Sequence, residues 1–420
     1  MTELSTDRKL GFGFLRLPQT DEDDPAAIDY ELTGQMADYF LSQGFRYFDT
    51  AYNYHKEFSE IAIREAVVKR HPREAFLLAD KMPTFLVTKT EDFERFFAEQ
   101  LARCGVDFFD FYLLHNLGKE RYGNMERLGA FEFMRKVKAE GKAKEIGFSF
   151  HDTADVLDRI LTEHPEMDFV QLQLNYIDWE SEVIQSRKCY EVAKKHGKPV
   201  TVMEPVKGGA LARLVPEAEK ILKDCEPDSS SASWAIRYAA SLDGVRMVLS
   251  GMSTLEQVKD NTAYMKDFRK LDKNGLDQIA KVVDILKKSQ AIQCTNCKYC
   301  MDECPMNINI PGYFSFYNSA SQQDNFIAVS YTHLFGLHAL PMPWITFPRT
   351  DCVSSLPSPV TTRSAPSRLF SNSLASSTTE IPERSFAPAK ATNAVLIPPA
   401  APAPGISWKA IPDFFLMTSA

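Results

Sequence analysis

The chain has 420 residues, of which 44% are hydrophobic and 25% are charged, and its formal net charge at pH 7 is −8. This composition is ordinary for a folded water-soluble protein, and the acidic balance gives no electrostatic support for nucleic-acid binding. Because MTELSTDRKL at the start has no apolar run and no stretch approaches the roughly 18 apolar residues of a membrane span, we expect a cytoplasmic protein with no nucleic-acid and no membrane partner.

Short apolar runs alternate with stretches of helical period from residue 10 to about 265. The strand-like runs are, in chain order, 10–17, 45–51, 75–81, 108–115, 145–149, 169–175, 199–204 and 245–250. The stretches of helical period include 59–70, 92–104, 125–140 and 182–195. Eight such units predict an α/β fold in the form of a closed (β/α)8 TIM barrel. An open doubly wound sheet is the alternative, and it is disfavoured because no G-x-G-x-x-G follows an early strand.

Four polar residues stand at or just after the ends of predicted strands. Asp49 ends the second strand, Tyr54 follows in its loop, Lys81 ends the third strand and His115 ends the fourth. Catalytic groups of (β/α)8 barrels come from these carboxyl ends. Each residue also has a plain interpretation, such as a helix cap, a rim aromatic or a buried histidine, but a lysine among apolar residues needs a charged partner. The four residues in register predict a catalytic site.

The motifs around these residues resemble those of the aldo-keto reductase family. FRYFDTAYNYHKEFSE contains the D-T-A-x-x-Y element and is followed by ADK, DFYLLH, GFSFH, VQLQLNY, MEPVKGGAL and VLSGMSTLEQVKDN. The resemblance covers about residues 8–265, with the motifs in the family's order. It implies an NAD(P)H-dependent oxidoreductase that transfers hydride between a nicotinamide and a small carbonyl or alcohol substrate.

The resemblance implies a role for each residue of the tetrad. Tyr54 is expected to donate a proton to the carbonyl in reduction and to accept one in alcohol oxidation. A free tyrosine has a pKa of about 10, so we expect the Lys81 ammonium to lower the pKa of Tyr54, with Asp49 holding that ammonium in place. His115 is expected to orient the carbonyl oxygen by hydrogen bonding.

The resemblance also assigns residues to the cofactor, NADP(H) or NAD(H). Ser149 and Gln171 match residues that hold the carboxamide, and Gly208 and Gly209 match the loop along the pyrophosphate, where glycine permits close backbone approach. The residues that match the adenosine-phosphate end are Ser250, Gly251, Gln257 and Asn261. Many members carry an arginine or lysine near Met252–Thr254 to bind a ribose phosphate, and none stands there. The preference for NADP(H) therefore rests on the habit of the family.

A run of cysteines follows the barrel. Cys294, Cys297, Cys300 and Cys304 are spaced C-x2-C-x2-C-x3-C-P, as in bacterial ferredoxins that hold a [4Fe–4S] cluster. A zinc site is the alternative, although zinc modules usually separate two cysteine pairs by a dozen or more residues. Within the family, a subgroup appends a ferredoxin-type module that usually has a second such run. This chain has one run, which predicts a small, partial ferredoxin-like iron–sulfur module and makes a redox partner protein a candidate.

These observations divide the chain into four segments. We expect a barrel at 1–270, a connecting helix at 271–290, the iron–sulfur module at 291–327 and a disordered or non-native tail at 328–420. The tail begins near AVSYTHL, which resembles a translated sequencing-adapter remnant, and continues with long Pro, Ser, Thr and Ala stretches that cannot bury a core. A chimeric or out-of-frame extension and a genuine disordered tail are the two interpretations.

Two further functions compete with an oxidoreductase that carries an iron–sulfur appendage. The first is an electron-transfer or redox-sensing iron–sulfur protein whose barrel binds a nucleotide without turnover. The second is a zinc-stapled interaction module on an inert barrel. The tetrad discriminates between them, because a sensor has no need of Tyr54 beside Lys81.

Overall fold

The computed structural model describes residues 8–21, 23–288, 292 and 310–321. The chain divides into two units, Met1–Pro343 and Trp344–Ala420, and every described residue lies in the first. The strands are β1 (Leu10–Gly13), β2 (Tyr47–Asp49), β3 (Leu77–Met82), β4 (Phe109–Leu117), β5 (Ala143–Phe150), β6 (Phe169–Gln173), β7 (Val200–Met203) and β8 (Val245–Gly251). The α-helices are α1 (Tyr30–Ser42), α2 (Ser59–Ile63), α3 (Glu91–Cys104), α4 (Lys119–Leu128), α5 (Ala130–Ala139), α6 (Ala154–Glu163), α7 (Ser186–Lys195), α8 (Pro216–Cys225), α9 (Ser231–Ser241), α10 (Leu255–Lys266), α11 (Lys273–Lys288) and α13 (Ile310–Ser321). Short helical turns are η1 (Tyr54–Glu57), η2 (Arg64–Val68), η3 (Arg73–Ala75) and η4 (Lys207–Gly209). Within the described residues, no helix is long and apolar enough to cross a membrane.

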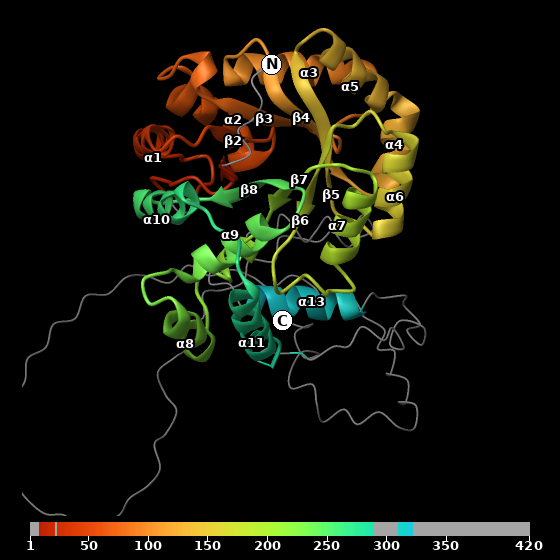
Figure 1. The fold of residues 1–420 in the computed structure, drawn as a ribbon. Coiled ribbons are helices and arrows are strands. Elements are labelled where there is room, and N and C mark those ends of the chain that lie inside the picture. Colours follow the sequence, from red (N-terminus) through yellow and green to blue (C-terminus); the bar gives the residue numbers. More distant parts are fainter. Residues whose placement is uncertain (1–7, 22, 289–291, 293–309, 322–420) are drawn as a thin grey trace, which may run out of the picture. The chain divides into compact units, whose positions relative to one another are not determined.

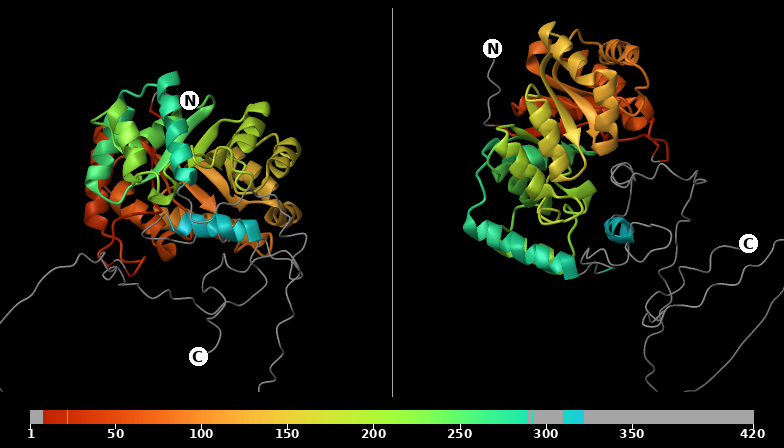
Figure 2. Two further views of the ribbon diagram at one scale, coloured as in Figure 1. Left: turned by 90° about the horizontal axis from the view of Figure 1, so that it is seen from below. Right: turned by 90° about the vertical axis from the view of Figure 1, so that its right-hand side faces the viewer.

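The eight strands form a closed parallel barrel in chain order. Each strand pairs with the next, and β8 pairs back onto β1, with Gly251 opposite Gly13. Helices lie around the outside of the strands, as Figure 1 and the turned views of Figure 2 show. The predicted (β/α)8 barrel is confirmed. The four cysteines of the predicted iron–sulfur module and the whole of 328–420 lie outside the described residues.

One end of the barrel interior is filled by apolar and aromatic side chains. These are Tyr47, Leu77, Ala79, Phe111, Leu113, Phe169, Met247 and Leu249. The Arg246 guanidinium pairs with Glu145 and lies over two of these rings, 4.8 Å from the centre of Phe111 and 4.2 Å from that of Phe169. Because side chains on a strand face the same side every second residue, the next inward positions toward the carboxyl ends carry Asp49, Lys81, His115 and Gln171. The apolar layer therefore closes one end and leaves the polar layer at the other.

A second apolar cluster joins α8, α9 and α11. Leu222 of α8, Trp234 and Tyr238 of α9, and Ile279 and Val282 of α11 are all buried in it. Helices α8 and α11 lie side by side in Figure 1. Residues 271–290, predicted as a connecting helix, thus include a helix that packs on the barrel helices along its apolar face.

Two predicted helices have different bounds in the structure. The stretch 125–140 is not one helix, because Gly129 adopts φ +82° and separates α4 from α5. Glycine adopts this left-handed conformation without the steric cost of a Cβ, and it commonly ends helices. The stretch 182–195 becomes helical only at Ser186.

The barrel wall predicts a sharp difference between two glycine substitutions. A Cβ on Gly147 in β5 would lie 2.5 Å from the carbonyl oxygen of Phe169, whereas a Cβ on Gly123 in α4 would meet no atom within 4 Å. We expect Gly147→Ala to destabilise the protein by about 1–3 kcal/mol or more, because backbone cannot move aside cheaply. The matched Gly123→Ala variant should be more stable by about 0.5–1 kcal/mol, since alanine favours a helix. Urea unfolding measures both, and equal stability of the two variants would contradict this account of the wall.

Candidate active site

The carboxyl ends of the strands open into a cavity of about 460 Å³. It is lined by nearly all of the barrel residues that the sequence singled out: Asp49, Tyr54, His115, Ser149, Gln171, Gly208, Gly209, Ser250, Gly251, Gln257 and Asn261. The exception is Lys81, which is fully buried and contacts the cavity through its neighbours. The structure therefore brings the predicted site residues of the barrel together in one place.

The ammonium of Lys81 is fixed by three acceptors. Its Nζ donates to Asp49 Oδ1 at 2.6 Å, to the carbonyl oxygen of Thr50 at 2.7 Å and to the Tyr54 hydroxyl at 3.3 Å. An ammonium has three hydrogens, so these contacts use its full donor capacity. The arrangement links the end of β2, the loop after it and β3 through one buried charge.

Burial and charge act in opposite directions on the three ionisable groups. Burial lowers the pKa of Lys81, but the Asp49 carboxylate and Tyr54 more than compensate, so its pKa lies above the usual value. Burial raises the pKa of Asp49, against the opposing effect of Lys81. Burial also raises the pKa of Tyr54 and outweighs the Lys81 ammonium, which acts to lower it.

Lys81 therefore acts on the pKa of Tyr54 in the predicted direction, but burial is the larger effect, so the net pKa lies above the usual value and not below it as expected. Removing a phenolate from water costs more here than one ammonium returns. Tyr54 consequently carries its proton at neutral pH, which is the form needed to donate it.

Tyr54 begins a turn with unusual backbone geometry. The next three residues, His55, Lys56 and Glu57, have φ values of 49°, 50° and 74°, in the left-handed region that residues with a Cβ disfavour. The buried His55 ring holds this turn, because its Nε2 accepts from the backbone N–H of Leu17 at 3.1 Å and its Nδ1 lies 2.8 Å from the carbonyl oxygen of Pro25. The loop after β1 thus supports the loop that carries Tyr54.

His115 faces the tyrosine ring edge-on. The two ring centres lie 5.9 Å apart at an interplanar angle of 81°. His115 is half-buried near the end of β4, and its ring also meets Phe85 edge-on at 5.9 Å. A polar ligand atom in the cavity therefore has a phenol and an imidazole on adjacent sides.

Two buried polar side chains at the ends of β5 and β6 leave hydrogen-bonding capacity for a ligand. Ser149 Oγ accepts from the backbone N–H of Asn116 at 2.7 Å, which leaves its hydroxyl hydrogen to donate elsewhere. Gln171 Oε1 is buried and has no hydrogen-bond partner among the described residues. An unsatisfied buried acceptor costs about 1–3 kcal/mol, so this site suits a ligand with N–H donors, such as a carboxamide.

The loop after β7 is held by an ion pair that sequence reasoning missed. Lys207 Nζ lies 2.7 and 2.9 Å from the two carboxylate oxygens of Asp178, and both side chains are buried. Asp178 also accepts from the amides of Gln173 and Asn175, at 3.1 and 2.9 Å. The pair fixes a run of left-handed backbone at Lys207 and the two predicted glycines, with φ values of 48°, 64° and 105°. A lysine directly before two glycines was the available signal.

The end of β8 is tied to α10 by side-chain amides. Asn261 Nδ2 donates to Ser250 Oγ at 2.9 Å, and Tyr264 donates to Asn261 Oδ1 at 2.6 Å. Gln257 Oε1 accepts from the backbone N–H of Ser253 at 2.7 Å. Both predicted amides therefore hold this wall of the cavity together. Arg16 and Arg213, which sequence reasoning did not single out, also line the cavity.

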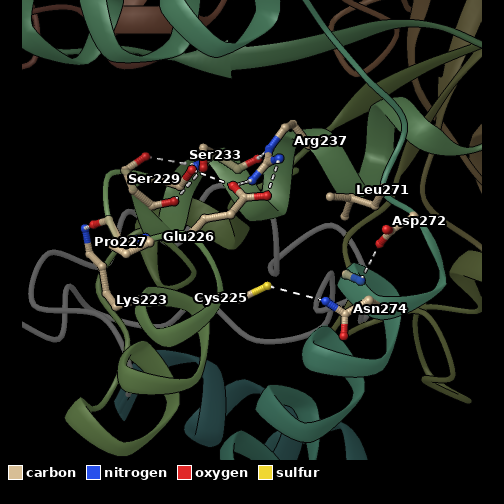
Figure 3. A network of polar contacts seen from close by, with 12 residues as sticks. Lys223, Cys225, Glu226, Pro227, Ser229, Ser233, Arg237, Leu271, Asp272 and Asn274 are labelled. Carbon is tan, nitrogen blue, oxygen red and sulfur yellow. Dashed lines mark hydrogen bonds and ion pairs between the residues drawn. The ribbon is translucent and has the colours of Figure 1, made fainter.

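The described cysteines form no metal site. Cys104 and Cys189 are buried, Cys225 is half-buried, and all three are free thiols. Within the described ranges, no group of three or more histidine, cysteine or acidic side chains is arranged to hold a metal. Cys225 accepts a hydrogen bond from Asn274 Nδ2 at 3.6 Å, beside the ion pair of Glu226 and Arg237 (Figure 3).

Comparisons with known proteins agree with this geometry. A family model described as the aldo/keto reductase family matches residues 9–284. Relatives named aldo-keto reductase in Mycobacterium avium (strain 104) and Mycolicibacterium paratuberculosis (strain ATCC BAA-968 / K-10) are each 28% identical over 230 residues, covering 53% of this chain and 71% of theirs. Among solved structures, an aldo-keto reductase from Klebsiella pneumoniae in complex with NADPH has a TM-score of 0.53 at 19% identity, over 66% of this chain and 90% of that one. The holo form of an aldo-keto reductase from Bacillus halodurans has a TM-score of 0.52 at 23% identity, over 65% and 91%. The two structural matches share the barrel fold.

The raised pKa of Tyr54 predicts the outcome of a tyrosinate titration. Phenolate absorbance of the ligand-free wild type and of Tyr54→Phe should superimpose up to about pH 10, because burial keeps this phenol protonated beyond the range of a free tyrosine. A phenol that titrates below that pH in the wild type alone would show that Lys81 outweighs burial.

Proposed function

This chain belongs to the aldo/keto reductase family, whose members are NAD(P)H-dependent oxidoreductases, and we propose that it is a carbonyl reductase that uses NADP(H) in the barrel cavity. The observation that carries this proposal is the contact of a buried Lys81 ammonium with both Asp49 and Tyr54 at the cavity wall. Small carbonyl compounds, and the corresponding alcohols in the reverse direction, are the proposed substrates.

In the proposed reaction, the chain's residues supply and manage one proton. The nicotinamide, when bound, supplies the hydride that the carbonyl carbon accepts. Tyr54 donates its hydroxyl proton to the carbonyl oxygen, so that an alcohol forms and a phenolate remains. Lys81 stabilises that phenolate across their 3.3 Å contact, and Asp49 balances the lysine charge. Water then returns the proton to Tyr54, and His115 orients the carbonyl oxygen.

The cavity wall supports the proposed position of the cofactor. Ser149 and Gln171 are assigned to the carboxamide, because the first retains a donor and the second an unsatisfied buried acceptor. The backbone at Gly208 and Gly209 is assigned to the pyrophosphate. Ser250, Gly251, Gln257 and Asn261 are assigned to the adenosine end. The guanidinium groups of Arg16 and Arg213 in the cavity lining suit phosphates, and the similar Klebsiella pneumoniae protein, solved with NADPH, favours NADP(H) over NAD(H).

A second part of the proposal concerns the cysteine run. We propose that Cys294, Cys297, Cys300 and Cys304 hold a [4Fe–4S] cluster, which makes the chain a member of the subgroup with an appended ferredoxin-type module. The support is the ferredoxin spacing in the sequence. Such a cluster and free thiols suit a reducing compartment such as the cytoplasm, and a redox partner protein would exchange electrons with the cluster.

Removing one hydroxyl tests the proposed reaction. We expect Tyr54→Phe to lower kcat for NADPH-dependent carbonyl reduction by about 10²–10⁴-fold, because the general acid is lost. The cofactor dissociation constant, measured by fluorescence quenching, should stay within about twofold, because Tyr54 is not assigned to cofactor binding. Both quantities are measured on the full chain over a panel of carbonyl substrates.

The matched control is Tyr39→Phe, which removes a hydroxyl from α1 on the outside of the barrel. It should retain wild-type kcat. Turnover by Tyr54→Phe at the wild-type rate would refute the assignment. A wild type that binds NADPH, turns over no carbonyl and retains a reducible cluster would favour the alternative of a redox sensor.

The cluster is tested by metal content. Anaerobically purified protein should contain iron and acid-labile sulfide in equal amounts, and Cys300→Ser should lose most of both, because a thiolate ligand is removed. Cys225→Ser is the matched control, since Cys225 lies in α8, outside the cysteine run, and its thiol contacts Asn274 of α11. Stoichiometric zinc without sulfide would overturn the cluster and favour a zinc module.

A further inference from the structure

Two carboxyl groups are buried together on the outward face of β3, directly behind the site. Asp80 alternates with Lys81 along the strand, so that Lys81 faces the barrel interior and Asp80 faces the helices. Glu60 comes from α2, and both carboxyl side chains have no exposure to solvent. The two groups interact, because besides burial the charge of Glu60 acts to raise the pKa of Asp80. Two buried carboxylates that act on one another repel, and this repulsion favours a proton on one of them.

This pair holds the backbone of Lys81. β2 pairs with β3 only as far as Asp49 and Ala79, so the backbone groups of Lys81 on that side have no strand beside them. Asp80 Oδ1 accepts from the N–H of Lys81 at 2.8 Å. Gln100 Nε2 donates to the carbonyl oxygen of Lys81 at 3.0 Å and to Glu60 Oε1 at 2.9 Å. The Asp80 and Gln100 side chains thus make the hydrogen bonds to the Lys81 backbone that β2 does not reach.

The surrounding charges do not balance two carboxylates. From α3, Arg103 Nε lies 2.7 Å from Glu60 Oε2, but the same guanidinium also approaches Glu57 at 3.7 Å and Glu99 at 3.5 Å. The Lys81 ammonium is engaged by three acceptors on the other face of the strand. The remaining titratable neighbours are the Cys104 thiol, 3.7 Å from Asp80 Oδ2, and the Tyr112 hydroxyl, which donates to Gln100 Oε1 at 2.5 Å. The Arg103 guanidinium therefore faces more acidic groups than its single charge can neutralise.

We propose that Asp80 and Glu60 share one proton at neutral pH and act as positioning residues that hold the Lys81 ammonium against Tyr54. The inference deepens the proposed function and rests on its assignment of Lys81. Burial, followed by the charge of Glu60, raises the pKa of Asp80 well above its usual range, and burial raises the pKa of Glu60 to about 7. These directions agree with a pair that retains one proton and gives it up in alkaline solution.

The sign of the linked stability change follows from the raised pKa values. In the unfolded chain both carboxyls ionise at about pH 4. The stability contributed by the protonated pair is therefore complete below about pH 4 and is lost as pH rises through the folded-state pKa values. Asp80→Asn keeps the shape and the hydrogen bonds of a protonated carboxyl but cannot ionise. Its melting temperature should fall less than that of the wild type between about pH 6 and pH 9.

Asp110→Asn is the control for this stability measurement. Asp110 is a buried acid on β4 that is paired with two cations, Arg73 and Lys144, each at 2.7 Å. Its replacement should lower the melting temperature by a similar amount throughout about pH 6–9, because the buried carboxylate and its contacts with two cations are lost. Infrared spectroscopy supplies a direct readout, since the wild type at neutral pH should show a protonated carboxyl band that Asp80→Asn lacks. Absence of that band, or a pH dependence of melting in Asp80→Asn equal to that of the wild type, would overturn the shared proton.

Catalysis supplies the test of positioning. Asp80→Ala should lower kcat by about tenfold or more with little change in cofactor affinity, because a displaced ammonium no longer meets Tyr54. Asp80→Asn should restore kcat and hold it to higher pH than the wild type. A kcat of Asp80→Ala equal to that of the wild type would refute positioning. Because melting and infrared measurements need no turnover, a failure of the proposed reaction would be seen separately from a failure of the shared proton.

Discussion

The buried ammonium of Lys81 is the constraint on which the rest of the site depends. A charge with no exposure to solvent is tolerated only where partners replace its water shell, and here Asp49, Thr50 and Tyr54 take all three hydrogens. These partners come from the end of β2 and from the loop that follows it. The ends of β2 and β3 must therefore lie at fixed positions along the barrel axis relative to one another. Parallel pairing of β2 with β3 sets those positions, with Asp49 opposite Ala79. The contacts of the Lys81 ammonium therefore depend on the register between β2 and β3.

Two loops that line the cavity are held in unfavourable backbone conformations by contacts with residues distant in sequence. The turn after Tyr54 has three consecutive left-handed residues and is anchored by His55 to the loop after β1. The loop after β7 is anchored by the Lys207–Asp178 pair. Such conformations cost about 1–2 kcal/mol per residue, and they persist because the surrounding contacts determine them. A cavity wall built this way is formed before any ligand arrives.

Sequence reasoning reached the barrel because its signal is local and repeated. Inward positions recur every second residue, so the strand ends that carry Asp49, Lys81 and His115 could be read from short apolar runs. The break at Gly129 was missed because helical period continues across it. The Lys207–Asp178 pair was missed because its members lie 29 residues apart and meet only in the folded chain. The effect of Lys81 on the pKa of Tyr54 could be predicted, but the net direction could not, because spacing shows a neighbouring charge and not the degree of burial, which is the larger effect.

The closed end of the barrel limits the routes by which substrate, product and protons can reach the cavity. Phe111, Phe169 and the Arg246–Glu145 pair fill one end of the barrel interior. In the proposed reaction, substrate, cofactor and protons therefore all enter at the carboxyl ends of the strands. In the proposed reaction, the proton that Tyr54 donates is replaced through the same opening by which the alcohol leaves. On this proposal a bound product blocks the reprotonation of Tyr54, so the general acid is restored only when the product leaves. A single opening would thus couple product release to the reprotonation of Tyr54.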